Sequence, residues 1–254
     1  MILAGMQPYF MPYLGYWQLI NAVNKIILYG YLNFIKGGWI NRNRIIQKNG
    51  EINYITVPLR KQSPSLLISE VQIDNSVNWS ERMLKTIMIN YKNAPYFDQI
   101  YPLIEGVLSK RYDTIMSINV ESICNIAAFL EIDTIIDFEN ERFREMEDRL
   151  AKIESDYSVM PYLEKTRPEK MVARMIEQCR MENSQHLINA IGGIDLYDKQ
   201  EFEQYGIALQ FIKMNDIQYP QFTHEFIPNL SIIDVMMHIG KEGTKKLLDE
   251  YTLI

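Results

Sequence analysis

The chain has 254 residues, of which 47% are hydrophobic and 23% charged, and its formal net charge is -6. This composition is typical of a globular α/β protein and excludes disordered and collagen-like classes. The acidic balance argues against a nucleic-acid-binding protein, and the apolar runs are too short to span a membrane.

The sequence carries no signal of export and no metal motif. The first residues lack a basic region before a long apolar run, so we expect no signal peptide and a cytoplasmic protein. Cys124 and Cys179 lie far apart without metal-site spacing, so we expect both to be reduced packing residues. No HExxH, P-loop or GxGxxG pattern is present, and we expect neither a metal nor a bound cofactor.

The hydrophobic pattern predicts alternating strands and helices along the chain. We expect strands at residues 2–6, 26–29, 44–47, 52–58, 71–73, 135–138, 186–190 and 207–212. We expect helices at residues 13–23, 78–91, 96–108, 115–130, 170–182, 199–204, 232–239 and 241–251. Asn49 and Gly50 form a strong turn signal between the third and fourth strands, which predicts a hairpin.

These elements predict an α/β fold with a mostly parallel, Rossmann-like sheet flanked by helices and joined to a β-hairpin. Residues 139–169 are dense in charge, and we interpret them as an exposed helical excursion away from the active site. We expect residues 1–254 to form a single domain.

The first segment with potential chemistry, QPYFMPYLGYW, follows the first strand at residues 7–17. In open α/β sheets the ligand crevice lies at the carboxyl ends of strands. Pro8 and Pro12 stiffen this turn, while Gln7 offers both a donor and an acceptor. The structural alternative is a rigid aromatic turn packed under a helix.

The second segment, KGGWINRNRI at residues 36–45, contains no acidic residue although the chain is acidic. Arginine suits a bidentate grip on phosphate or carboxylate. The segment offers a ligand the backbone amides of Gly37 and Gly38, the charges of Lys36, Arg42 and Arg44, the side-chain amides of Asn41 and Asn43, and the ring of Trp39. The alternative is a loop whose arginines pair with surface carboxylates.

The third segment is a polar and aromatic loop before the helix expected at residues 232–239. Of the three histidines, His224 in this loop is a more plausible general base than His186, which lies in a strand. Ser231 and Asp234 fit a capping pair, which places a helix N-terminus directly after the loop.

Six segments, in this order over nearly the whole chain, resemble the WbqC-like family of bacterial surface-polysaccharide gene clusters: QPYFMPYLGYW, FIKGGWINRNRI, NAPYF, INAIGGIDLY, GIALQF and QYPQFTHEFIPNLSIIDVM. The resemblance implies a transferase of O-antigen or lipopolysaccharide biosynthesis that N-acylates or N-aminoacylates a nucleotide-linked amino sugar. An acyl thioester, carried on coenzyme A or on an acyl carrier protein, would be the donor. The chain departs from the family at Gly30 and Tyr31, where an acidic pair is frequent, so its activity or substrate could differ.

The implied activity assigns roles to the residues of these segments. The diphosphate would contact Lys36, Gly37, Gly38, Arg42 and Arg44, with Trp39 stacked on the base or sugar and with Tyr9, Asn43 and Gln221 also contacting the substrate. Gln7, Asn41 and His224 would act at the reacting amine, and His224 would accept its proton. This predicts that Arg42→Ala raises the Michaelis constant and that His224→Ala lowers turnover.

Two other functions remain open on the sequence. A nucleotidyl transferase is one, because such enzymes bind a nucleoside triphosphate at the first helix, although Tyr13 and Tyr16 stand where a histidine pair would be expected. A non-catalytic partner that binds a nucleotide sugar or an acyl carrier is the other. The sequence does not determine the sugar, the acyl group, the donor or the oligomeric state.

Overall fold

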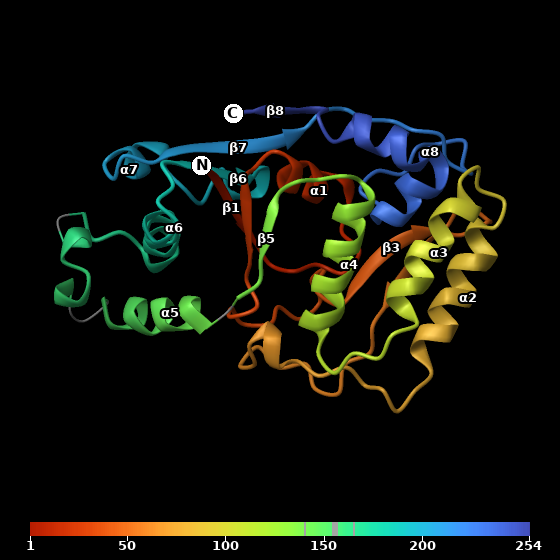
Figure 1. The fold of residues 1–254 in the computed structure, drawn as a ribbon, viewed down its shortest axis with the longest axis horizontal. Coiled ribbons are helices and arrows are strands. Elements are labelled where there is room, and N and C mark those ends of the chain that lie inside the picture. The colour runs from red at the N-terminus through yellow and green to blue at the C-terminus, as the bar shows by residue number, and fades with distance from the viewer. Residues whose placement is uncertain (140, 154–156, 165) are drawn as a thin grey trace.

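A six-stranded sheet forms the centre of the computed structural model, which describes residues 1–139, 141–153, 157–164 and 166–254 (Figure 1). The strand order is β5-β2-β1-β6-β7-β8. All neighbouring pairs are parallel except β7 with β8. The strands are β1 (Ile2–Met6), β2 (Lys25–Leu28), β5 (Ile135–Asp137), β6 (His186–Ala190), β7 (Ala208–Met214) and β8 (Tyr251–Leu253). The predicted α/β fold with a mostly parallel sheet is confirmed.

The predicted hairpin is a separate two-stranded sheet of β3 (Arg42–Ile46) and β4 (Ile52–Thr56). Gly50 adopts a φ of 84° in the turn and donates its N–H to the carbonyl of Gln47 at 2.9 Å. β3 begins two residues before the predicted start at residue 44. Part of the basic segment is therefore strand rather than loop.

Helices cover both faces of the six-stranded sheet. They are α1 (Leu14–Asn21), α2 (Trp79–Tyr91), α3 (Phe97–Leu108), α4 (Ile115–Phe129), α5 (Glu141–Ile153), α6 (Lys170–Met181), α7 (Lys199–Glu203) and α8 (Ile232–Leu247). Short 3-10 turns occur at Ile68–Glu70, Tyr157–Val159, Pro161–Leu163 and Ile191–Gly193. Figure 1 shows α5, α6 and α7 toward one end of the molecule and α1 to α4 with α8 toward the other.

The four central strands of the sheet, β1, β2, β6 and β7, divide their side chains between two hydrophobic cores. In β1, Ala4 belongs to the core formed with α1 to α4 and α8, whereas its neighbour Leu3 belongs to the core formed with α5, α6 and α7. Ile26 and Ile27 in β2 divide in the same way. This follows from the two-residue period of a strand, and each fully buried aliphatic side chain contributes about 1.5–3 kcal/mol.

The segment interpreted as a charged excursion contains α5, which has one buried face. Its buried residues recur at helical spacing and are Phe143, Met146, Leu150 and Ile153. Arg142 at its start forms ion pairs with Asp137 and, at 2.7 Å, with Glu182. These contacts fix α5 against the rest of the fold. Residues 140, 154–156 and 165 of the excursion lie outside the described residues.

Two element predictions are wrong. Residues 71–73 form isolated bridges, Leu59 with Ile73 and Gln72 with Thr114, rather than a strand. The last predicted helix stops at Leu247, and residues 251–253 form β8 instead. The edge of β7 explains this strand, because Phe211 and Ile254 exchange backbone hydrogen bonds at 2.9 Å each.

The predicted break between two terminal helices is confirmed at Gly240, where α8 contains a non-helical residue with a φ of 66°. A Cβ atom there would lie 2.4 Å from the ring of Tyr96. We expect Gly240→Ala to lower the free energy of unfolding by about 2–4 kcal/mol, from backbone strain and this overlap. Urea denaturation measures the change.

Gly106→Ala is the matched control for this prediction. Gly106 lies in α3, and a Cβ atom added there would have no atom within 4 Å other than those of its chain neighbours and of its own helix backbone. We expect this variant to gain about 0.5–1 kcal/mol, because alanine favours a helix interior. Equal stability of the two variants would contradict the strain argument.

The remaining general features concern membranes, metals and cysteines. Within the described part of the chain, no helix has the length and apolar character to cross a membrane. No cluster of metal-binding side chains occurs among the same residues. Both cysteines are free, and burial raises the pKa of the Cys179 thiol to about 12.

Candidate functional site

The strand order reverses at β1. The chain passes from β1 outward through β2 to β5, and later from β6 outward through β7 to β8. The loops after β1 and β6 therefore leave a crevice at the carboxyl ends of these strands, which is where open α/β sheets bind ligands. The structure has a cleft of about 530 Å³ there, lined by Tyr9, Pro12, Tyr13, Gly15, Trp39, Asn43, Arg44, Ala190, Ile191, Ile212, Lys213, Met214 and Asn229.

The proline-rich turn after β1 forms one wall of the cleft. The side-chain amide of Asn43 donates to the carbonyls of Phe10 at 3.0 Å and Met11 at 2.8 Å. The hydroxyl of Ser231 also donates to Met11, at 2.8 Å, and the φ of Met11 is 45°. Asn43 is buried, so its amide fixes the shape of the turn while the residue lines the cleft.

Aromatic rings form much of the remaining surface of the cleft. The ring of Tyr9 lies 5.6 Å from that of Tyr16, and burial raises the pKa of Tyr9 and of Tyr13. Both phenols therefore remain neutral at physiological pH. Trp39 keeps 36% of its surface exposed, which leaves its ring accessible to a flat ligand.

Arg44 brings a positive charge to the cleft from β3. Its Nη2 donates to the carbonyl of Asn229 at 3.0 Å, and the guanidinium carbon lies 5.4 Å from the centre of the Trp39 ring. Its Nε is buried and has no hydrogen-bond partner in the described chain. Because a buried donor is costly to leave unpaired, this atom is a natural place for a ligand oxygen.

The cations in and around the cleft have no acidic partner among the residues that the structure describes. Ion pairs elsewhere include Lys25 with Asp137 at 2.8 Å. Among the described residues, none of the ion pairs involves Lys36, Arg42, Arg44 or Lys213. The alternative of arginines paired to surface carboxylates is therefore not what this part of the structure shows. The arrangement favours an anionic ligand.

Arg42 lies two residues before Arg44 in β3 but has a different environment. Its guanidinium donates to the carbonyls of Gly37 and of Gly38, the latter at 3.3 Å, and it lies 4.9 Å from the centre of the Tyr54 ring. These contacts hold the glycine loop, in which Gly37 has a φ of 79°. Arg42 is not among the residues that line the cleft.

Four of the sequence-predicted site residues line the cleft, namely Tyr9, Trp39, Asn43 and Arg44. The others do not, and they are Gln7, Lys36, Gly37, Gly38, Asn41, Arg42, Gln221 and His224. Asn41 is buried and donates to the carbonyl of Val57 at 2.9 Å. Gln7 is half-buried at the end of β1, and His224 is exposed. The predicted roles of these residues remain predictions.

The sequence analysis missed the side of the cleft formed by β6, β7 and the connection to α8. The missed residues include Ala190, Ile191, Lys213, Met214 and Asn229. Two signals lay near them: the glycine pair that follows β6 marks a turn at a strand end, and Asn229 lies in the polar and aromatic loop before α8. A lysine at the end of a strand has no distinguishing pattern.

Tyr31, at the departure from the family pattern, packs away from the cleft. It is 3% exposed, and its ring stacks on Phe143 with centroids 5.4 Å apart. Its hydroxyl accepts a hydrogen bond from Nε2 of Gln178. Tyr31 therefore belongs to the core beneath α5 and α6.

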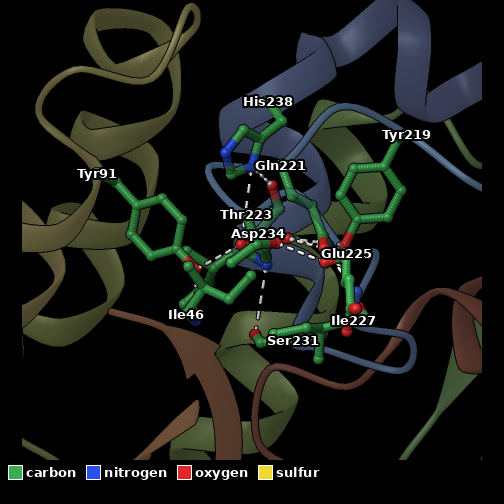
Figure 2. Close-up of polar contacts among 11 residues, drawn as sticks. Ile46, Tyr91, Tyr219, Gln221, Thr223, Glu225, Ile227, Ser231, Asp234 and His238 are labelled. Carbon is green, nitrogen blue, oxygen red and sulfur yellow. Dashed lines mark hydrogen bonds and ion pairs between the residues drawn. The ribbon is translucent and has the colours of Figure 1, made fainter. Parts of the chain in front are cut away.

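A buried polar cluster lies at the start of α8 (Figure 2). Ser231 caps the helix by accepting from the N–H of Ile233 at 3.3 Å. Asp234 does not complete a capping box, because its carboxylate accepts from the hydroxyls of Tyr91 and Tyr219, at 2.7 Å each, and from Nε2 of Gln221 at 3.2 Å. The cluster thus joins α2, the connection after β7, and α8.

The buried Asp234 carboxyl is expected to make the stability of the fold depend on pH. Burial raises its pKa, although His238 and the hydrogen bonds of Tyr91, Tyr219 and Gln221 lower it in part. The folded chain thus binds this proton more tightly than the unfolded chain, whose pKa is about 3.9. Binding of this proton therefore stabilises the fold fully at a pH below the pKa of Asp234 in the unfolded chain. This contribution is lost as the pH rises through the pKa of Asp234 in the folded chain.

Asparagine has no such proton to lose. We therefore expect the stability difference between the parent chain and Asp234→Asn to shrink as the pH rises from about 4 toward neutrality. Urea denaturation across this range measures it, with Asp216→Asn, at an exposed position, as the control. A difference that grows with pH would contradict the direction of the shift.

The comparisons with known proteins agree with the resemblance seen in the sequence. The chain belongs to the WbqC-like protein family, whose model matches residues 7–246. An uncharacterized protein of Mycobacterium tuberculosis is 24% identical over 243 residues, which cover 94% of each chain. No solved structure shows a significant match.

Proposed function

We propose that this chain transfers an acyl group from a thioester to the amine of a nucleotide-linked amino sugar in bacterial surface-polysaccharide biosynthesis. The observation that carries the proposal is the cleft at the reversal of strand order, where Arg44 and Lys213 form no ion pair with the acidic residues that the structure describes. Membership of the WbqC-like family supports the pathway.

A nucleotide sugar matches the cleft in two ways. Its diphosphate would lie against Arg44 and Lys213, since Nε of Arg44 still lacks a partner. Its base or a sugar face would lie against Trp39, Tyr9 or Tyr13, whose rings line the same space. Aromatic walls with a few placed polar groups are typical of small-molecule sites.

The proposed reaction needs no charged intermediate on the protein. The amine nitrogen attacks the thioester carbonyl, a C–N bond forms and the C–S bond breaks. The sulfur leaves as a thiolate and takes up the proton that the nitrogen loses. Among the described residues that line the cleft there is no carboxylate, imidazole or thiol, so orientation of the two substrates would supply the rate enhancement.

The His224→Ala variant tests directly whether the leaving thiolate accepts the proton of the amine. The sequence predicts that His224 accepts the proton, whereas transfer of the proton to the leaving thiolate needs no histidine. A lower kcat in His224→Ala with an unchanged Michaelis constant would support a role as base. An unchanged kcat would remove that role and leave the thiolate as the acceptor.

The activity itself is tested with defined substrates. The purified chain is incubated with a nucleotide-linked 4-amino sugar and a series of acyl-CoA thioesters. Mass spectrometry should show one acyl group added to the sugar nucleotide, with release of an equal amount of free thiol. A thiol released without an acylated sugar indicates thioester hydrolysis and would contradict the proposal.

A non-catalytic role is the second candidate, and the lack of a carboxylate, imidazole or thiol among the described lining residues of the cleft favours it. In that case the chain would bind the nucleotide sugar or an acyl carrier for another enzyme. Binding of the sugar nucleotide, seen as a rise in Tm, without product from any thioester would support this role.

A further inference from the structure

We infer that Gln221, anchored on the buried carboxylate of Asp234, is a positioning residue that holds Arg44 ready for the anion of the ligand. This inference rests on the proposed function only in that it takes Arg44 to bind an anionic group. It concerns the connection between β7 and α8, residues 215–231, which contains no helix or strand.

The anchor of this connection is fully buried. Asp234 is 0% exposed in the first turn of α8. Its Oδ2 accepts from the Tyr219 hydroxyl and from Nε2 of Gln221, which both belong to the connection, while Oδ1 accepts from Tyr91 of α2 (Figure 2). The two oxygens thus serve different parts of the structure.

Gln221 carries the link from the anchor to the cleft. Its Oε1 accepts from the N–H of Ile227 at 2.8 Å, and its Nε2 donates to the carbonyl of Ile227 at 3.0 Å. This pair closes the loop between residues 221 and 227. The next two carbonyls, of Pro228 and Asn229, accept from Nη2 of Arg44 at 3.5 and 3.0 Å.

Within the described part of the chain, the groups that Arg44 contacts are neutral. Carbonyl oxygens orient a guanidinium but do not neutralise it, whereas a carboxylate would compete with the ligand for its charge. The carboxylate of Asp234 instead accepts hydrogen bonds from the tyrosine hydroxyls and from the Gln221 amide, and not from Arg44. Arg44 is therefore fixed in direction and keeps its charge and its unpaired Nε for an anion.

The test is a double-mutant cycle in which isothermal titration calorimetry measures the Kd of inorganic pyrophosphate for each variant. Gln221→Leu removes the link while keeping the side-chain volume. We expect it to weaken pyrophosphate binding by about threefold to tenfold, the effect of one hydrogen bond. In a chain that also carries Arg44→Ala, the same change should have no further effect.

Tyr91→Phe is the matched control. It removes the hydrogen bond to the other oxygen of Asp234, from α2, and keeps the ring. A purely structural role of the cluster would lower Tm in both Tyr91→Phe and Gln221→Leu and change the pyrophosphate Kd in neither. We expect the Kd to change only for Gln221→Leu.

The possible failures are distinct. If Arg44→Ala weakens binding and Gln221→Leu does not, or if Gln221→Leu weakens it equally in both backgrounds, positioning is wrong while the anion site stands. If pyrophosphate does not bind, or if Arg44→Ala leaves its binding unchanged, the anion site and the positioning role fail together.

Discussion

Replacing Asp234 by alanine is expected to lower the free energy of unfolding by about 2–4 kcal/mol. The carboxylate is fully buried and accepts three hydrogen bonds, from Tyr91, Tyr219 and Gln221. Removing it leaves three donors without their acceptor. The hydrogen bonds compensate only in part for the burial of the carboxylate, so the variant also loses a desolvation penalty, which offsets part of this cost.

The effect extends beyond the side chain itself, because Asp234 joins separate elements. The Tyr91 hydroxyl that donates to Asp234 also accepts from the N–H of Ile46 at 3.2 Å, at the end of β3. Loss of the carboxylate should therefore loosen α2, the end of β3 and the connection to α8 together. Hydrogen exchange measured by mass spectrometry should show faster exchange in all three segments.

Asp216→Ala is the control for this prediction. Asp216 is exposed in the same connection, and a surface substitution of this kind changes stability by about 0.5 kcal/mol or less. Urea denaturation of both variants gives the comparison. Equal losses would mean that the carboxylate at Asp234 contributes little, and the cluster would then be an ordinary set of weak contacts.

The elements that the sequence predicted well are those that repeat a local pattern. The short apolar runs of β1 and β2, the turn at Gly50 and the break at Gly240 depend on residues adjacent in the chain. β8 was mistaken for helix because it exists only where the free edge of β7 offers it backbone partners. That edge is formed by residues about 40 positions earlier, which no local pattern records.

The candidate site also depends on contacts between residues far apart in the chain, which a local sequence pattern does not record. Composition predicted that KGGWINRNRI binds an anionic ligand, and the structure brings Trp39, Asn43 and Arg44 from it to the cleft. Composition could not separate Arg42 from Arg44, since both are arginines on alternate positions of one strand. Which of the two faces the cleft depends on the glycine loop and on Asn229, which lies 185 residues from Arg44 in the chain.

Replacing Arg44 by alanine is expected to weaken binding of a nucleotide-linked amino sugar by about tenfold to a hundredfold. A hydrogen bond to a charged group contributes about 1.5–3 kcal/mol, and each 1.4 kcal/mol is about tenfold in affinity. Arg44→Lys should recover only part of the loss, because an ammonium group keeps the charge without the planar fork of donors. Isothermal titration calorimetry measures each Kd.

Arg42→Ala provides the control, because Arg42 carries the same charge in the same strand and likewise has no acidic partner among the described residues. The sequence alone predicted an effect on the Michaelis constant for Arg42→Ala. The geometry assigns the larger effect to Arg44, since Arg42 is engaged by the glycine loop and Tyr54 and does not line the cleft. We therefore expect Arg42→Ala to change the Kd by less than about threefold, through long-range charge alone.

Measuring each Kd at low and at high ionic strength distinguishes a direct contact between Arg44 and the ligand from long-range electrostatic attraction. If both variants lose affinity equally, and if the losses vanish at high ionic strength, the cations act only as a diffuse positive field and the cleft is not the binding site. A loss confined to Arg44→Ala that persists in high salt requires a desolvated contact. In this structure Arg44 is placed to make that contact, because its guanidinium lies 5.4 Å from the centre of the Trp39 ring and its Nη2 donates to the carbonyl of Asn229.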